Sequence, residues 1–104
     1  MDKRELVYSP RAQRDLLAMP GKFAGQVLDD LALLEFPHWP PGKVKKLKGG
    51  EYWEIKTGDW RTVFWPEGKK VVVLRVVNRR DLDKTLGRIN LSELIRWLGM
   101  ATQV

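Results

Sequence analysis

Three apolar segments between residues 52 and 80 constrain the fold of this chain most strongly. They are rich in Val, Trp, Tyr and Phe, which favour strands, and comprise Tyr52–Thr57, Trp60–Trp65 and Val71–Asn78. Gly58-Asp59 fits a tight hairpin turn between the first two, and Pro66–Lys69 closes the next. The sequence therefore predicts a largely antiparallel sheet. Val71–Val77, apolar on both faces except at Arg75, is expected to be a central strand.

Two helices are predicted before the sheet. Ser9 is a favoured N-cap residue and Pro10 suits the first helical position, while Pro20-Gly21 interrupts the helix. A second helix is expected from Gly21 or Lys22 to about Glu35, because its apolar residues recur three and four positions apart. Joined by so short a turn, the two helices should form a hairpin that covers one face of the sheet.

The other segments are shorter or carry fewer signals. Glu5–Tyr8 is expected to form a first strand, and the proline-rich Phe36–Gly42 excludes helix and central strand. Val44–Lys48 reads as a lysine-rich edge strand, and Asp81–Leu86 as a polar turn or short helix. A C-terminal helix of about residues 90–99 is predicted from the capping residues Asn90 and Glu93, with an apolar stripe at Leu91, Leu94, Ile95 and Leu98.

Length and composition predict a single globular domain over residues 1–104. The chain contains no cysteine and one histidine, so a disulfide framework, a thiolate zinc site and a histidine metal cluster are all excluded. We expect no metal and no cofactor. No apolar run approaches the roughly 20 residues of a membrane span, and no signal peptide is recognisable, so a cytoplasmic location is expected.

Positive charge is concentrated in the sheet half of the chain. The formal net charge is +6, yet residues 1–40 hold five basic and six acidic side chains, whereas residues 41–88 hold thirteen basic and six acidic. Such a basic patch attracts phosphate polymers. The alternative is a lysine-rich surface that serves solubility, and in Val44–Lys48 the lysines fit edge protection and phosphate contact equally well. The candidate contacts to RNA are Lys45, Lys46, Lys48, Arg75 and Arg80.

Aromatic residues are candidates for stacking on bases. For at least two of Trp53, Trp60 and Trp65, packing in the core is the better interpretation. Trp39, in the proline-rich connector, is a candidate for an exposed stacking residue. His38 lies in the same connector, where a lone histidine is more often solvated or packed than catalytic.

Three segments in order resemble the RelE/ParE superfamily of toxins from type II toxin–antitoxin systems. They are Tyr8–Leu16 (YSPRAQRDL), the hairpin Leu47–Lys56 (LKGGEYWEIK) with Trp60–Trp65 (WRTVFW), and Val76–Lys84 (VVNRRDLDK). The resemblance implies an α+β fold, with two N-terminal helices packed on a twisted, mostly antiparallel sheet of four to five strands. It also implies a cognate antitoxin as partner, and in the RNA-cleaving branch an endoribonuclease that cuts mRNA on the ribosome.

Carried over by position, the catalytic cations of that branch correspond to Lys56, Arg61 and Arg79. Arginine suits the phosphate oxygens, because its planar fork holds two of them and stays protonated. Lys56 is the candidate base, with Glu54 or Asp81 as alternatives. The structural alternative is that Lys56, Glu54 and Arg61 form ordinary cross-strand ion pairs.

Two departures from the pattern leave three functions open. Glu54 stands where some members have a second lysine, and no aromatic residue lies near Thr85, where a tyrosine would be expected. The leading hypothesis is a ribosome-dependent mRNA endonuclease, followed by a ParE-like inhibitor of DNA gyrase and by an RNA-binding relative that has lost catalysis. The C-terminal apolar stripe would pack on its own sheet, form a dimer or fill the groove of an antitoxin helix. The oligomeric state stays open.

Overall fold

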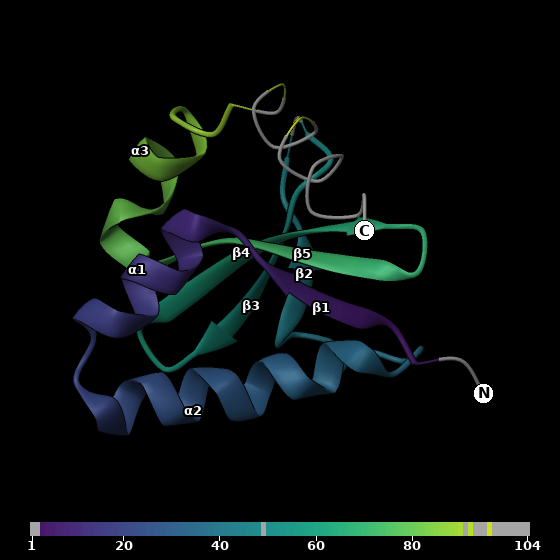
Figure 1. Cartoon of the computed structure of the whole chain (residues 1–104), viewed down its shortest axis with the longest axis horizontal. Coiled ribbons are helices and arrows are strands. Elements are labelled where there is room, and N and C mark those ends of the chain that lie inside the picture. The colour runs from purple at the N-terminus through teal and green to yellow at the C-terminus, as the bar shows by residue number, and fades with distance from the viewer. Residues whose placement is uncertain (1–2, 49, 91, 93–95, 97–104) are drawn as a thin grey trace.

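A computed structural model of the chain describes residues 3–48, 50–90, 92 and 96. The expected α+β architecture is confirmed in that part of the chain, and Figure 1 shows its arrangement. The elements in chain order are β1 (Glu5–Tyr8), α1 (Pro10–Ala18), α2 (Gly21–Ala32), the 3-10 turn η1 (Leu33–Glu35), β2 (Val44–Lys46), β3 (Trp53–Thr57), β4 (Trp60–Glu67), β5 (Lys70–Asn78), the 3-10 turn η2 (Arg79–Asp81) and α3 (Leu82–Leu86). The predicted helix over residues 90–99 lies largely outside the described residues.

The five strands form one mixed sheet in the order β1-β5-β4-β3-β2. Three neighbouring pairs are antiparallel, whereas β1 runs parallel to β5, with Glu5 opposite Lys70 and Tyr8 opposite Val73. β5 is therefore an interior strand, as its apolar sequence predicts. Its register with β4 shifts between Val63 and Phe64, so that Leu74 has no partner there.

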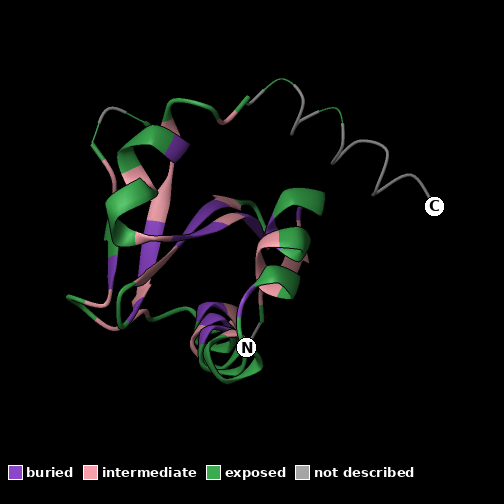
Figure 2. Ribbon diagram, turned by 90° about the vertical axis from the view of Figure 1, so that its left-hand side faces the viewer, coloured by how far each residue is buried: buried purple, intermediate pink, exposed green. Residues whose placement is uncertain are grey.

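The two N-terminal helices cover one face of the sheet, as expected. Buried residues of α1 and α2, including Ala12, Val27 and Leu31, pack on Ile55 and Phe64 of the sheet. We call this side the helical face. Figure 2 shows the buried residues gathered along the sheet and on the inner side of α2.

The opposite side of the sheet carries a second, smaller core, and we call it the cationic face. Val63, Trp65, Val72 and Leu74 are buried there, and Leu82, Leu86 and Ile89 from the α3 segment pack against them. In Figure 1, α2 runs along the lower side of the sheet and α3 lies at its upper left. α3 itself spans only five residues, Leu82–Leu86.

The expected C-terminal ends of β4 and β2 are wrong. Pro66 belongs to β4, opposite Val71, and not to the following turn. The pairing of β3 with β4 starts at Trp53 and Phe64, so no β3 residue lies opposite Pro66, which needs no amide hydrogen there. The lysine-rich edge strand is also shorter than predicted and ends at Lys46.

Candidate nucleic-acid interface

The β3–β4 hairpin places two cations directly opposite each other. Lys56 on β3 is the cross-strand partner of Arg61 on β4, and the turn between them is Gly58-Asp59. Gly58 has a positive φ of 57°, which residues with a Cβ adopt at a cost. Arg61 lies two residues before the buried Val63, so strand alternation puts both cations on the cationic face. Both side chains are half-buried.

Arg61 is held in place by the backbone of its own hairpin. Its Nη1 donates to the carbonyl oxygen of Gly58 at 2.7 Å and to that of Trp60 at 2.9 Å. These acceptors are neutral, so they fix the guanidinium group without cancelling its charge. Within the described part of the chain, neither Arg61 nor Lys56 has an acidic ion-pair partner.

Arg79 lies at the same end of the sheet, just after β5. Its backbone N–H donates to the carbonyl oxygen of Asp59 at 2.8 Å, which ties η2 to the hairpin turn. The Arg79 Nε lies 3.6 Å from Asp59 Oδ1, and both side chains are largely exposed. Exposed ion pairs of this kind contribute little to stability. Another anion can therefore readily replace Asp59 as the partner of Arg79. The structure thus brings Lys56 and Arg61 together, with Arg79 beside their connecting turn.

Glu54 is a buried carboxylate on the same face. It is 2% exposed and lies directly opposite Val63 on β4 and Lys45 on β2. The Lys45 Nζ lies 3.8 Å from Glu54 Oε1, and Oε2 has no hydrogen-bond partner among the described residues. A carboxylate buried with one long ion pair is costly, because desolvation is only partly offset. Glu54 forms an ion pair with neither Lys56 nor Arg61, so the alternative of ordinary cross-strand ion pairs among these residues is wrong.

The five candidate RNA contacts lie in different places. Lys45 is engaged with Glu54, while Lys46 lies opposite Trp53 and therefore on the helical side. Lys48 is exposed after the end of β2, and Arg80 is exposed in η2. The structure therefore does not bring these residues into one cluster.

Arg75 makes the shortest ion pair that the structure describes. Its Nε and Nη2 donate to the two carboxylate oxygens of Asp15 on α1, at 2.8 and 3.2 Å. Asp15 also accepts from the backbone N–H of Val76 at 2.9 Å. β1 ends opposite Val73, so this carboxylate satisfies a β5 amide beyond the end of its parallel neighbour.

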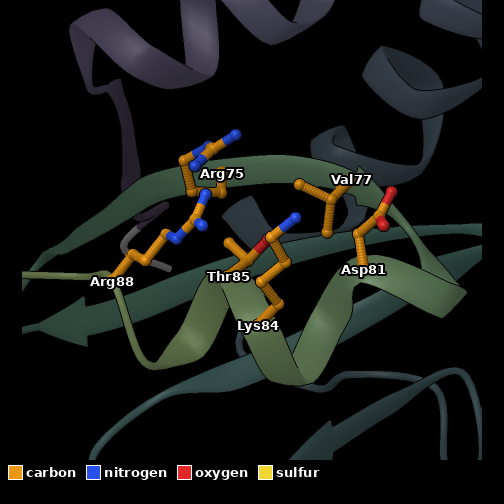
Figure 3. A pocket seen from close by; sticks show the side chains of 6 residues that line it. All are labelled: Arg75, Val77, Asp81, Lys84, Thr85 and Arg88. Atoms are coloured by element: carbon orange, nitrogen blue, oxygen red, sulfur yellow. The ribbon is translucent and has the colours of Figure 1, made fainter.

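A pocket of about 230 Å³ lies between β5 and α3 (Figure 3). Its lining comprises Arg75, Val77, Asp81, Lys84, Thr85 and Arg88. Sequence reasoning did not select Lys84 or Arg88. Arg88 follows the end of α3 at Leu86, so helical spacing does not pair it with Lys84, and only the fold brings the two to the pocket. Thr85 is buried in the pocket wall, where the resemblance implies an aromatic residue.

The tryptophans contribute mainly to packing. Trp65 is buried, and Trp53 and Trp60 pack against the core of the helical face, as expected. The prediction that Trp39 is an exposed stacking residue is wrong. Its ring meets those of Trp53 and Phe64 edge-on at 5.3 and 5.4 Å, its Nε1 donates to the carbonyl oxygen of Leu34, and Arg4 lies 4.7 Å from the ring centroid.

The described residues lack two further features. They contain no group of three or more His, Cys, Asp or Glu side chains placed to hold a metal ion. None of their helices has the length and apolar character needed to cross a membrane.

Solved structures share this architecture. The archaeal RelE–RelB complex from Pyrococcus horikoshii OT3 matches with a TM-score of 0.64 at 20% identity, covering 74% of this chain and 96% of that one. YafQ from E. coli strain BL21(DE3) matches with a TM-score of 0.63 at 17% identity, covering 77% and 98%. The toxin–antitoxin complex RelBE from E. coli matches with a TM-score of 0.61 at 22% identity, covering 72% and 95%. The protein therefore has a RelE-like fold.

The sequence itself identifies the family. Residues 6–83 match the model of the ParE toxin of the type II toxin–antitoxin system parDE. The chain belongs to this family of toxins, within the RelE/ParE superfamily that its sequence resembles. No curated protein matches it.

Proposed function

We propose that this toxin is an endoribonuclease that cuts mRNA on the ribosome and is neutralised by a cognate antitoxin. The observation that carries the proposal is the direct opposition of Lys56 and Arg61 beside the turn of the β3–β4 hairpin. Like charges in directly opposed cross-strand positions destabilise a hairpin. Neither residue has an acidic partner within the described chain, so an anion from outside is the group that would neutralise them.

A phosphodiester of RNA fits that requirement. In the reaction, the ribose 2′ oxygen forms a bond to the adjacent phosphorus as the bond to the 5′ oxygen breaks. The 2′ proton passes to a base, and the leaving 5′ oxygen takes up a proton. Arg61, held by Gly58 and Trp60, is suited to bind the phosphoryl oxygens, where charge builds up. Arg79 assists from beside the turn.

The base is Lys56 or Glu54. Lys56 lies opposite Arg61, within reach of the same phosphate. Glu54 lies two residues earlier on the same strand face, with one carboxylate oxygen that has no partner among the described residues. Asp81 lies in the pocket beside α3 and not in the hairpin, which favours the other two.

The antitoxin partner is supported by the solved relatives. The matching structures from P. horikoshii and E. coli are complexes of a toxin with its antitoxin. We propose the same kind of partner here, and mRNA on the ribosome as the target.

The decisive experiment compares wild type with Arg61→Ala in a ribosome-containing cleavage assay. Removing one donor to a developing oxyanion lowers the rate by about 10²–10³-fold, so we expect cleavage to fall by that factor while the circular dichroism spectrum is unchanged. Lys22→Ala, at an exposed position of α2, is the matched control and should cleave normally. Growth arrest on induction with no new mRNA ends would refute the proposal.

A second candidate is inhibition of DNA gyrase, as in a ParE-like toxin. It is favoured by the buried carboxylate of Glu54, at a position where some members of the superfamily have a second lysine, and by Thr85 in place of an aromatic residue. This function predicts stalled gyrase complexes and DNA damage on induction. An unchanged supercoiling reaction with purified gyrase would argue against it.

A further inference from the structure

The pocket between β5 and α3 collects basic groups from two elements. Arg75 comes from β5, while Lys84 and Arg88 come from the α3 segment. In Figure 3, the side chains of Arg88 and Lys84 extend from that segment toward β5, and Arg88 points toward Arg75. Lys84 and Arg88 are exposed and have no acidic ion-pair partner in the described part of the chain.

Arg75 lines the pocket, and its guanidinium group is held by α1. Asp15 binds its Nε and Nη2, and Asp15 is itself fixed by the backbone N–H of Val76. The remaining N–H groups of Arg75 are free of this pair. A donor locked in this way loses little further conformational freedom when it binds an anion.

The net charge of the pocket suits a ligand that carries a single negative charge. Arg75, Lys84 and Arg88 contribute three positive charges, and Asp15 and Asp81 contribute two negative charges, which leaves a formal charge of +1. An internal phosphodiester carries one negative charge. A terminal phosphate monoester carries about −1.5 to −2 at neutral pH and would meet the Asp81 carboxylate.

The pocket also lies next to the proposed catalytic hairpin. Val77 lines the pocket and is the direct cross-strand partner of Arg61. Neighbouring strands are about 4.7–4.9 Å apart, so one RNA strand can contact both places. Resting on the proposed action on RNA, we infer that this pocket binds an internal phosphodiester of the RNA beside the one that is cut.

The test measures binding to a single-stranded 2′-O-methyl oligoribonucleotide, which lacks the attacking hydroxyl and cannot be cut. Fluorescence anisotropy over a range of salt concentrations gives the slope of log K against log salt, with about −0.7 per phosphate contacted on single strands. We expect the double variant Lys84→Gln/Arg88→Gln to lose about 0.7 of that slope. The control Lys22→Gln/Lys69→Gln removes the same charge at exposed positions on α2 and in the β4–β5 turn.

Three results decide the matter. A slope in the pocket variant equal to that of wild type would overturn the inference, and so would an equal loss in the control variant. A 5′-phosphate on the probe should leave wild-type affinity unchanged. A tenfold gain that disappears in the pocket variant would show that the pocket holds RNA ends and would also overturn the inference.

The same probe separates this inference from the proposed function. If the protein binds the uncut probe through the pocket but never cleaves mRNA, the proposed endonuclease activity is refuted and the inferred phosphodiester site is retained. Loss of pocket binding with normal cleavage would do the reverse.

Discussion

At the scale of single residues, the repulsion between Lys56 and Arg61 lowers the stability of the hairpin at the proposed site. The two cations face each other on β3 and β4, half-buried and without a described carboxylate partner. Lys56→Met keeps most of the aliphatic stem and removes the repulsion. Cross-strand pairs change stability by roughly 0.2–1 kcal/mol, so we expect the free energy of unfolding to rise by about that amount in urea denaturation, while toxicity falls. A less stable variant would show that Lys56 contributes to folding.

Glu54→Gln distinguishes the two candidate bases. The amide keeps the shape of the buried side chain and removes a charge that has only one long ion pair, so stability should change little or increase. If Glu54 is the base, cleavage falls by about 10²–10⁴-fold. If Lys56 is the base, cleavage is nearly unchanged in Glu54→Gln and is lost in Lys56→Met. Single-turnover rates on ribosome-bound mRNA measure the difference.

Strand alternation predicts that Val63 and Trp65 share a side with Arg61, and both lie in the core of the cationic face. Alternation does not predict that Glu54 is buried or that the lysines of β2 lie in different places. Whether Lys46 faces the helices or the open side depends on where β2 pairs with β3, and this register is set by contacts distant in the sequence. The pocket combines Arg75 with Lys84 and Arg88 only because α3 folds back over β5, which no local pattern specifies.

At the scale of elements, Ser9 joins α1 to the sheet. Its hydroxyl accepts from the Ala12 N–H at 3.1 Å and donates to the carbonyl oxygen of Leu74 at 2.8 Å, in a site that is 2% exposed. Loss of a serine cap costs about 0.5–2 kcal/mol, and here a buried carbonyl also loses its donor. We therefore expect Ser9→Ala to lower the free energy of unfolding toward the upper end of that range.

Equilibrium denaturation in urea measures this loss. Ser9→Thr, which keeps the hydroxyl, is the matched control and should retain most of the stability. Equal stability of Ser9→Ala and wild type would mean that the cap contributes nothing.

The order of the elements followed from the sequence because each has a local signal, such as the Ser9-Pro10 helix start or the Gly58-Asp59 turn. Which elements lie next to each other in space did not follow from the sequence. The parallel pairing of β1 with β5 joins the first strand to the last, and only the tertiary fold brings these segments together. Pro66 was assigned to a turn because proline disfavours strands, yet β4 extends past the start of β3, where a missing N–H has no cost.

At the scale of the whole molecule, stability should fall in alkaline solution. Burial, with a smaller effect of Glu35, raises the pKa of Tyr8 above its usual 10.0, and burial with Glu51 raises the pKa of Tyr52 in the same way. The unfolded chain therefore releases these protons at lower pH than the folded one. The stability they contribute is present below pH 10 and is lost as the pH rises through the folded-state values.

Urea midpoints measured between about pH 8 and about pH 11.5 should decline in the upper part of the series. Tyr8→Phe/Tyr52→Phe is the control and should flatten the decline. If the stability of this variant declined as much as that of wild type, other titrating groups would be the cause.

The position of β5 also bears on how the toxin is made. Among the described strands, β5 is the only neighbour of β1, and it contributes to both the helical core and the cationic face. During synthesis, residues 5–8 leave the exit tunnel long before residues 70–73 exist to pair with them. Contacts between such distant segments form late. A nascent chain is thus expected to lack the paired Arg61 and Val77, and with them the proposed site, until most of it has been translated.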